Sequence, residues 1–168
     1  MPEESTIGDL AILVVDDEPD ILETVEDLLD TCLVHKASTY EEALQYVLSY
    51  TYDVVILDIM GVKGFELLKE SVNRGFPTIM FTANALSTES LKKSIQLGAV
   101  SFLPKEKAAE LPTFIKDIVS GGGKPVWRKL FRKLEESFNV SFGPDWKEKD
   151  RFFREFEESL EKDKVESD

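Results

Sequence analysis

The sequence contains very few of the residues that build disulfides and zinc sites. Among its 168 residues there is one cysteine, Cys32, and one histidine, His35. A single cysteine excludes an internal disulfide, and no Cys/His cluster could hold zinc. We therefore expect Cys32 to act as a small apolar residue. We expect His35, which falls in a short apolar segment, to have a structural role.

Long apolar runs are also missing, and so is an export signal. No run approaches the ~20 apolar residues that cross a bilayer. Residues 1–5 are acidic and polar, without a basic segment followed by an apolar one, so we expect a cytoplasmic protein. A hydrophobic content of 42% with 32% charged residues is typical of a globular protein.

A basic surface is absent from most of the chain. The net charge is −13, and residues 1–120 hold 21 acidic but only 9 basic side chains. This part would repel DNA, so we expect no direct DNA binding. Residues 121–168 are nearly balanced, with 12 acidic and 11 basic side chains. The glycine-rich segment 121–125 predicts a flexible linker between a domain at residues 1–120 and an extension at residues 126–168.

Residues 1–120 alternate between two kinds of pattern. Short apolar segments rich in β-branched residues predict buried parallel strands, and apolar residues at helical spacing predict helices between them. Ser38-Thr39 followed by Glu41-Glu42 resembles a capping box at the start of one helix. The predicted strands are 9–15, 33–37, 53–57, 78–81 and 100–103, and the helices begin near residues 18, 39, 65, 86 and 108. This series predicts an α/β fold with a doubly wound, five-stranded parallel sheet.

Polar residues follow four of these strands. They are Asp16-Asp17, Asp58, Thr82 and Pro104-Lys105. The carboxyl ends of parallel strands meet at one edge, where ligands bind. Three carboxylates in one pocket repel one another unless a cation neutralises them, and a set of oxygen ligands suits Mg²⁺. Asp58 would then attack phosphorus as a nucleophile while the metal and Lys105 screen charge, and the product would be an acyl phosphate.

These residues, with Ala83 and Phe102, resemble the signature of response-regulator receiver domains over residues 9–119. The resemblance implies a flavodoxin-like fold and phosphorelay signalling. Asp17, Asp58 and the backbone carbonyl of Met60 would bind Mg²⁺, and Asp16 would act through a bound water. Asp58 would accept the phosphoryl group from a sensor histidine kinase or a phosphotransfer protein.

The resemblance also assigns roles after phosphorylation. Thr82 would hydrogen-bond the phosphoryl group, Lys105 would pair with it, and the small Ala83 would leave it accessible. Phe102 would turn inward as a switch and change the face formed by the fourth helix, the fifth strand and the fifth helix. We expect this change to alter association with a downstream protein or with a second copy. We expect no enzyme activity beyond self-phosphorylation and autodephosphorylation at Asp58.

The chain departs from the family pattern in two places. Val62 and Gly64 stand four and six residues after Asp58, where the family has proline at four and glycine at eight. Glu106 follows Lys105, where the family has proline. These departures keep open a second hypothesis, a protein-binding module that does not respond to phosphorylation. A third, a small-molecule enzyme, is disfavoured because G-x-G-x-x-G and P-loop patterns are absent.

The extension predicts two amphipathic helices followed by a charged tail. The first, residues 126–138, carries the apolar residues Val126, Trp127, Leu130, Phe131, Leu134 and Phe138 opposite the basic Arg128, Lys129, Arg132 and Lys133. The second begins near Asp145 and carries Trp146, Phe153, Phe156 and Leu160. We expect both apolar stripes to pack on each other and on the first domain. A basic helix that binds a membrane surface or an acidic partner is the less favoured alternative.

Overall fold

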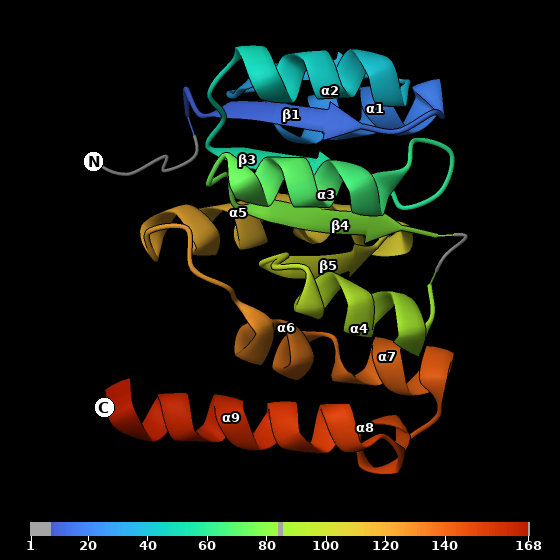
Figure 1. Ribbon diagram of the computed structural model, residues 1–168, viewed down its shortest axis with the longest axis vertical. Coiled ribbons are helices and arrows are strands. Elements are labelled where there is room, and N and C mark those ends of the chain that lie inside the picture. The colour runs from blue at the N-terminus through green and yellow to red at the C-terminus, as the bar shows by residue number, and fades with distance from the viewer. Residues whose placement is uncertain (1–7, 84–85, 168) are drawn as a thin grey trace.

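The computed structural model describes residues 8–83 and 86–167 (Figure 1). Its centre is a five-stranded parallel sheet in the order β2-β1-β3-β4-β5. The strands are β1 (Ala11–Val15), β2 (Leu33–Ala37), β3 (Val54–Leu57), β4 (Thr78–Thr82) and β5 (Ser101–Pro104). The predicted doubly wound fold is therefore confirmed.

Helices cover both faces of this sheet. Figure 1 shows α2 (Tyr40–Ser49), α3 (Gly64–Asn73) and α4 (Thr88–Gln96) in front of it, with α1 (Pro19–Leu28) and α5 (Leu111–Ser120) behind. The central strands β3 and β4 are buried at every residue. This explains their nearly continuous apolar sequences, because neither face of these strands meets water.

Local capping signals start several helices where the sequence predicts them. Thr39 Oγ1 accepts a hydrogen bond from Glu42 N at 3.2 Å, and Glu42 Oε1 accepts one from Ser38 N at 3.1 Å. Ser87 caps α4 in the same way, through Ser90 N at 3.0 Å. These side chains satisfy backbone N–H groups that have no partner inside the helix. The closing helix α5 begins later than predicted, at Leu111, because residues 105–110 form a 3₁₀ segment, η1.

The extension differs from the prediction of two helices. Its described residues form α6 (Trp127–Lys133), α7 (Glu135–Phe142), α8 (Trp146–Lys149) and α9 (Arg151–Ser167). The backbone leaves the helical region at Leu134, between α6 and α7, and at Asp150, between α8 and α9. Asp150 Oδ1 accepts a hydrogen bond from Phe152 N at 2.8 Å. This aspartate acts as a helix-start signal inside the second predicted helix, which apolar spacing alone does not reveal.

The extension packs against the free side of β5. In Figure 1, α6 and α7 lie beside β5 and α4, and α9 forms the outermost layer. Its apolar side chains join the core of the sheet domain, including the buried Trp127, Leu130, Phe131, Leu134, Phe138, Trp146 and Phe153. The prediction that the stripes pack on each other and on the first domain is confirmed, because Phe138 of the first stripe lies against Phe102 and Phe156 of the second lies against Trp127.

The basic side of α6 partly faces the sheet domain. Lys133 Nζ lies 2.9 Å from Glu110 Oε1, and Lys129 Nζ lies 3.5 Å from Asp117 Oδ1. Backbone contact adds to these pairs, because Val126 N donates to Val100 O at 2.9 Å. Among residues 8–83 and 86–167, we find no helix with the length and apolar composition of a membrane span.

Candidate functional site

Three aspartates gather at the carboxyl edge of the sheet. Asp16 and Asp17 directly follow β1, and Asp58 directly follows β3. One carboxylate oxygen from each lies within 4.8 Å of the other two. Asp16 is 1% exposed and Asp58 5% exposed, whereas Asp17 faces solvent. The neighbouring strands β1 and β3 thus bring together residues that the sequence separates.

Lys105 links these acids from the end of β5. Its Nζ lies 2.7 Å from Asp16 Oδ2, 3.0 Å from Asp58 Oδ2 and 3.0 Å from Glu18 Oε1. Burial by itself lowers the pKa of Lys105, but the contacts with these carboxylates outweigh burial and raise the pKa above its ordinary value. The lysine is therefore a fixed cation. Glu18 was not predicted as a member of this site, although it directly follows the Asp16-Asp17 pair.

Asp16 and Asp58 are held differently. Burial raises the pKa of the Asp16 carboxyl, and the contacts with Lys105 and Glu18 N only partly offset this effect. Asp58 is oriented at both oxygens, because Oδ1 accepts a hydrogen bond from Ile59 N at 2.8 Å and Oδ2 accepts one from Lys105 Nζ. The Asp58 carboxylate is therefore held in one orientation. The ionised form of Asp16 is disfavoured by burial, and a further cation at the site would stabilise it.

The short loop after Asp58 depends on two glycines. Gly61 has φ +83°, and a Cβ there would overlap the Asp17 carboxylate, with Asp17 Cγ only 2.7 Å away. A Cβ at Gly64 would overlap Asp58 O and lie 2.6 Å from Ile59 Cα. The absent side chains allow the turn to pack directly on the acids. This close approach allows the short turn after Asp58 to lead directly into α3 at Gly64.

The remaining predicted residues occupy the same edge or the strand beside it. Thr82 is buried at the end of β4, opposite Pro104 of β5, and Ala83 follows it at the surface. Met60 lies in the turn after Asp58 with its side chain 54% exposed. Phe102 is fully buried, and its ring centroid lies 6.5 Å from that of Phe138 in α7. The peptide bonds of the described residues are trans, including the one after Lys105.

The donor set fits a magnesium ion. Asp16, Asp17 and Asp58 each offer a carboxylate oxygen, which is the ligand type that Mg²⁺ prefers. The mixture of one exposed and two buried acids leaves a side open to water, as a partly hydrated Mg²⁺ requires. The described residues offer no nitrogen or sulfur ligand in this group, so zinc chemistry is not indicated.

Comparison with protein families agrees with this geometry. The family model described as the response regulator receiver domain matches residues 12–116. The chain belongs to this family. Receiver domains typically bind Mg²⁺ at an acidic pocket and interact with histidine kinases or phosphotransfer proteins. The matched residues include all those predicted at the sheet edge.

Relatives and solved structures show the same domain in larger and smaller proteins. The two-component response regulator ARR2 of Arabidopsis thaliana is 33% identical over 141 residues, covering 80% of this chain and 19% of the relative. A protein-glutamate methylesterase/protein-glutamine glutaminase of Syntrophomonas wolfei is 29% identical over 140 residues, covering 77% of this chain and 37% of the relative. This receiver chain therefore spans about a fifth of the length of the plant regulator.

A solved structure extends the comparison to three dimensions. The CheY-like receiver domain protein of Methanospirillum hungatei superposes with a TM-score of 0.62 at 26% identity. The match covers 68% of this chain and 96% of that one. The superposition therefore accounts for the receiver fold.

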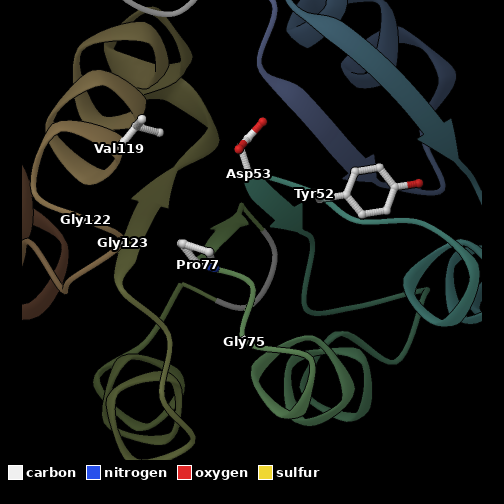
Figure 2. Close-up of a pocket in the computed structure, with 7 residues that line it drawn as sticks. All are labelled: Tyr52, Asp53, Gly75, Pro77, Val119, Gly122 and Gly123. Carbon is white, nitrogen blue, oxygen red and sulfur yellow. The ribbon is translucent and has the colours of Figure 1, made fainter.

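A separate hollow lies at the opposite, amino-terminal end of the strands (Figure 2). It has a volume of about 290 Å³ and is lined by Tyr52, Asp53, Gly75, Pro77, Val119, Gly122 and Gly123. Asp53 Oδ2 accepts a hydrogen bond from Ala11 N at 2.8 Å. Asp53 therefore ties the starts of two strands together, and it is separated from the acids at the carboxyl edge by the length of β3.

Proposed function

We propose that this receiver accepts a phosphoryl group on Asp58 from a histidine kinase or phosphotransfer protein, with Mg²⁺ as cofactor. The observation that carries the proposal is the buried Lys105, whose ammonium group contacts Asp16, Glu18 and Asp58 at once. A buried lysine with a raised pKa stays charged. Because the Lys105 ammonium group already lies beside the Asp58 carboxylate, it can pair with the oxygens of a phosphoryl group on Asp58.

The transfer exchanges one bond to phosphorus for another. An Asp58 oxygen forms a bond to phosphorus while the bond from phosphorus to the donor's imidazole nitrogen breaks. That nitrogen keeps the electron pair, and the ring leaves neutral with a proton on its other nitrogen. Ile59 N and Lys105 hold the Asp58 carboxylate in one orientation, so positioning and electrostatics supply most of the rate enhancement.

The metal would be held by Asp17, Asp58 and the Met60 carbonyl, with Asp16 acting through water. When bound, it would neutralise the clustered acids and screen charge on the phosphoryl oxygens. Gly61 lets the loop that contains Met60 pack directly against the Asp17 carboxylate. Thr82 and the exposed Ala83 complete the proposed phosphoryl site.

We further propose that the extension receives the signal. Lys105 directly follows β5, and Phe102 in that strand contacts Phe138 of the extension. When Lys105 pairs with a phosphoryl group, its position and that of β5 would change, and the packing of Phe102 on Phe138 would change with them. The result would be altered association with a downstream protein or a second copy, in a cytoplasmic protein with no other enzyme activity.

The test is phosphorylation of the full chain in vitro. The protein would be incubated with Mg²⁺ and acetyl phosphate and its intact mass measured. We expect one base-labile phosphoryl adduct on the wild type and none on Asp58→Asn. Asp53→Asn is the matched control, because it makes the same change at the other end of β3 and should keep the adduct.

The same experiment separates the alternatives. An adduct that persists in Asp58→Asn would exclude Asp58 as the acceptor. A folded wild-type protein that gains no adduct would instead support the module that binds partners without phosphorylation. Omission of Mg²⁺ should abolish the adduct, and an unchanged yield without the metal would contradict the proposed cofactor.

A further inference from the structure

A second hollow lies where the extension meets the receiver. It has a volume of about 580 Å³ and is bordered by the end of α4, the segment that connects α5 to α6, the start of α6 and the middle of α9. The volume is within the range of about 300–1,000 Å³ that is common for small-molecule sites.

The walls of this hollow are largely apolar. Ile95 of α4, Trp127 of α6 and Phe156 and Leu160 of α9 contribute to them. Trp127 is 4% exposed, and its ring lies edge-on to Phe156 with centroids 6.3 Å apart. These side chains come from three helices and form a fixed apolar surface, which can accept an aliphatic chain or a flat ring.

The charges at the hollow are positive, in contrast to the rest of the chain. Lys124, Arg128 and Lys129 line it, with Asp117 as the acidic residue. Asp117 already pairs with Lys129. Lys124 and Arg128 therefore form a local positive region in a protein with a net charge of −13.

The guanidinium group of Arg128 has a donor without an acceptor among the described residues. Within the part of the chain that the structure describes, its Nε is buried and has no hydrogen-bond partner. A buried guanidinium N–H without an acceptor is unfavourable, and native proteins usually satisfy such groups. An anionic oxygen entering the hollow would supply the missing acceptor.

We propose that this hollow binds a small amphipathic anion, namely an aliphatic or aromatic body that carries one carboxylate. The carboxylate contacts Arg128 and Lys124, and the body packs on the apolar wall formed by Ile95, Trp127, Phe156 and Leu160. Because the ligand touches α4, α6 and α9 together, it holds the extension against the receiver. Binding therefore raises the melting temperature of the full chain. This site lies apart from Asp58 and does not depend on phosphorylation.

Trp127 makes the proposal directly measurable. The chain has two tryptophans, so Trp146→Phe leaves Trp127 as the single tryptophan reporter. This variant would be titrated with decanoate, with decanol and with decyltrimethylammonium, each below its aggregation concentration. We expect saturable fluorescence change with decanoate, binding at least about tenfold weaker with decanol because a charge-assisted hydrogen bond is lost, and no binding of the cation.

Two substitutions on one helix test the assigned cation. Arg128→Gln should weaken decanoate binding at least about tenfold. Arg132→Gln makes the same charge change on α6 outside this hollow and should leave affinity unchanged. Lys124→Gln, in the connecting segment, removes an exposed positive charge of the hollow without altering a buried group. It should also weaken decanoate binding. Asp58→Asn should bind decanoate as the wild type does, which separates this site from the proposed phosphorylation.

Three results would overturn the proposal. The first is equal affinity for decanol and decanoate, which would leave no role for the cations. The second is an equal loss of affinity in Arg128→Gln and Arg132→Gln, which would indicate a general charge effect. The third is binding to vesicles of anionic phospholipid without binding of monomeric decanoate, which would assign these cations to a membrane surface.

Discussion

The receiver site and the extension bury different kinds of side chain. At the carboxyl edge of the sheet, a lysine with 7% of its side chain exposed contacts two buried aspartates. In the extension, aromatic rings pack on one another and on β5, with Phe131, Phe138, Trp146 and Phe153 at the centre. One region is an arrangement of opposite charges, and the other is an apolar core.

The difference shows how the two regions divide stability and function. Burial raises the pKa of Asp16, so the charged site has an electrostatic cost and depends on a few partners with defined geometry. The aromatic contacts are favourable and largely non-directional, so they attach the extension firmly. We therefore expect the extension to contribute mainly stability and the acids to contribute chemistry.

The largest expected effect comes from the apolar side of the comparison. Phe138→Ala should lower the free energy of unfolding by about 3–5 kcal/mol, because it leaves a cavity against Phe102. Val140→Ala, two residues away in α7 and 86% exposed, should change it by less than about 0.5 kcal/mol. Urea denaturation measures both. Equal stabilities for the two variants would show that the extension is not part of the receiver's cooperative unit.

The charged side should be almost as sensitive to loss of its cation. Lys105→Met should cost about 3 kcal/mol of unfolding free energy without divalent ions, because buried carboxylates lose their partner. Added Mg²⁺ should recover part of that loss. Lys116→Met removes an exposed lysine and serves as the control, with a change below about 0.5 kcal/mol. A Lys105→Met protein as stable as the control would mean that the acids are not held by charge.

A smaller effect should distinguish two glycines with the same backbone conformation. Gly61 and Gly75 have φ of +83° and +82°, but only Gly61 lies against another group, the Asp17 carboxylate. Replacement of either glycine by alanine should lower the free energy of unfolding by about 1–2 kcal/mol, because alanine disfavours the left-handed backbone conformation. Gly61→Ala alone should also weaken Mg²⁺ binding in calorimetry, because its methyl group displaces Asp17. Unchanged Mg²⁺ affinity in Gly61→Ala would place the metal elsewhere.

The smallest expected effect concerns a surface pair between the two regions. Lys92 Nζ of α4 lies 2.8 Å from Asp150 Oδ2 at the start of α9. A double-mutant cycle with Lys92→Met and Asp150→Asn should give a coupling of about 0.2–1 kcal/mol. A coupling energy between Lys92 and Asp150 as large as that of a buried contact would contradict the view that apolar packing holds the extension.

The same pair predicts a dependence on pH. The hydrogen bond from Lys92 lowers the pKa of Asp150 below its ordinary value. Between the lowered pKa of the folded protein and the ordinary carboxyl pKa, the unfolded chain binds more protons than the folded one. The pair therefore adds to the free energy of unfolding above the ordinary pKa, and this contribution is lost as the pH falls through the lowered pKa. The coupling measured in the cycle should therefore be present at neutral pH and vanish in strong acid.

Much of the receiver could be predicted because its signals are local. The apolar segments that end in Asp16-Asp17, Asp58 and Lys105 identify parallel strands, and parallel strands place their ends together. The hydrogen bonds that Thr39 Oγ1 accepts from Glu42 N and Glu42 Oε1 accepts from Ser38 N follow from the spacing of these residues in the chain. The addition of Glu18 to the lysine's partners, and the contact of Gly61 with Asp17, could not be predicted, because they depend on side-chain positions across the sheet edge.

The amino-acid pattern was sufficient for the α/β fold and for the gathering of acids at one edge, since strand periodicity and helix caps act over a few residues. Three-dimensional packing alone decided where the extension lies and how it is divided into helices. Its apolar stripes require a partner surface, but a stripe does not identify that surface. Phe138 meets Phe102 at β5, which is an edge strand of the sheet, and this edge exists only once the five strands have assembled.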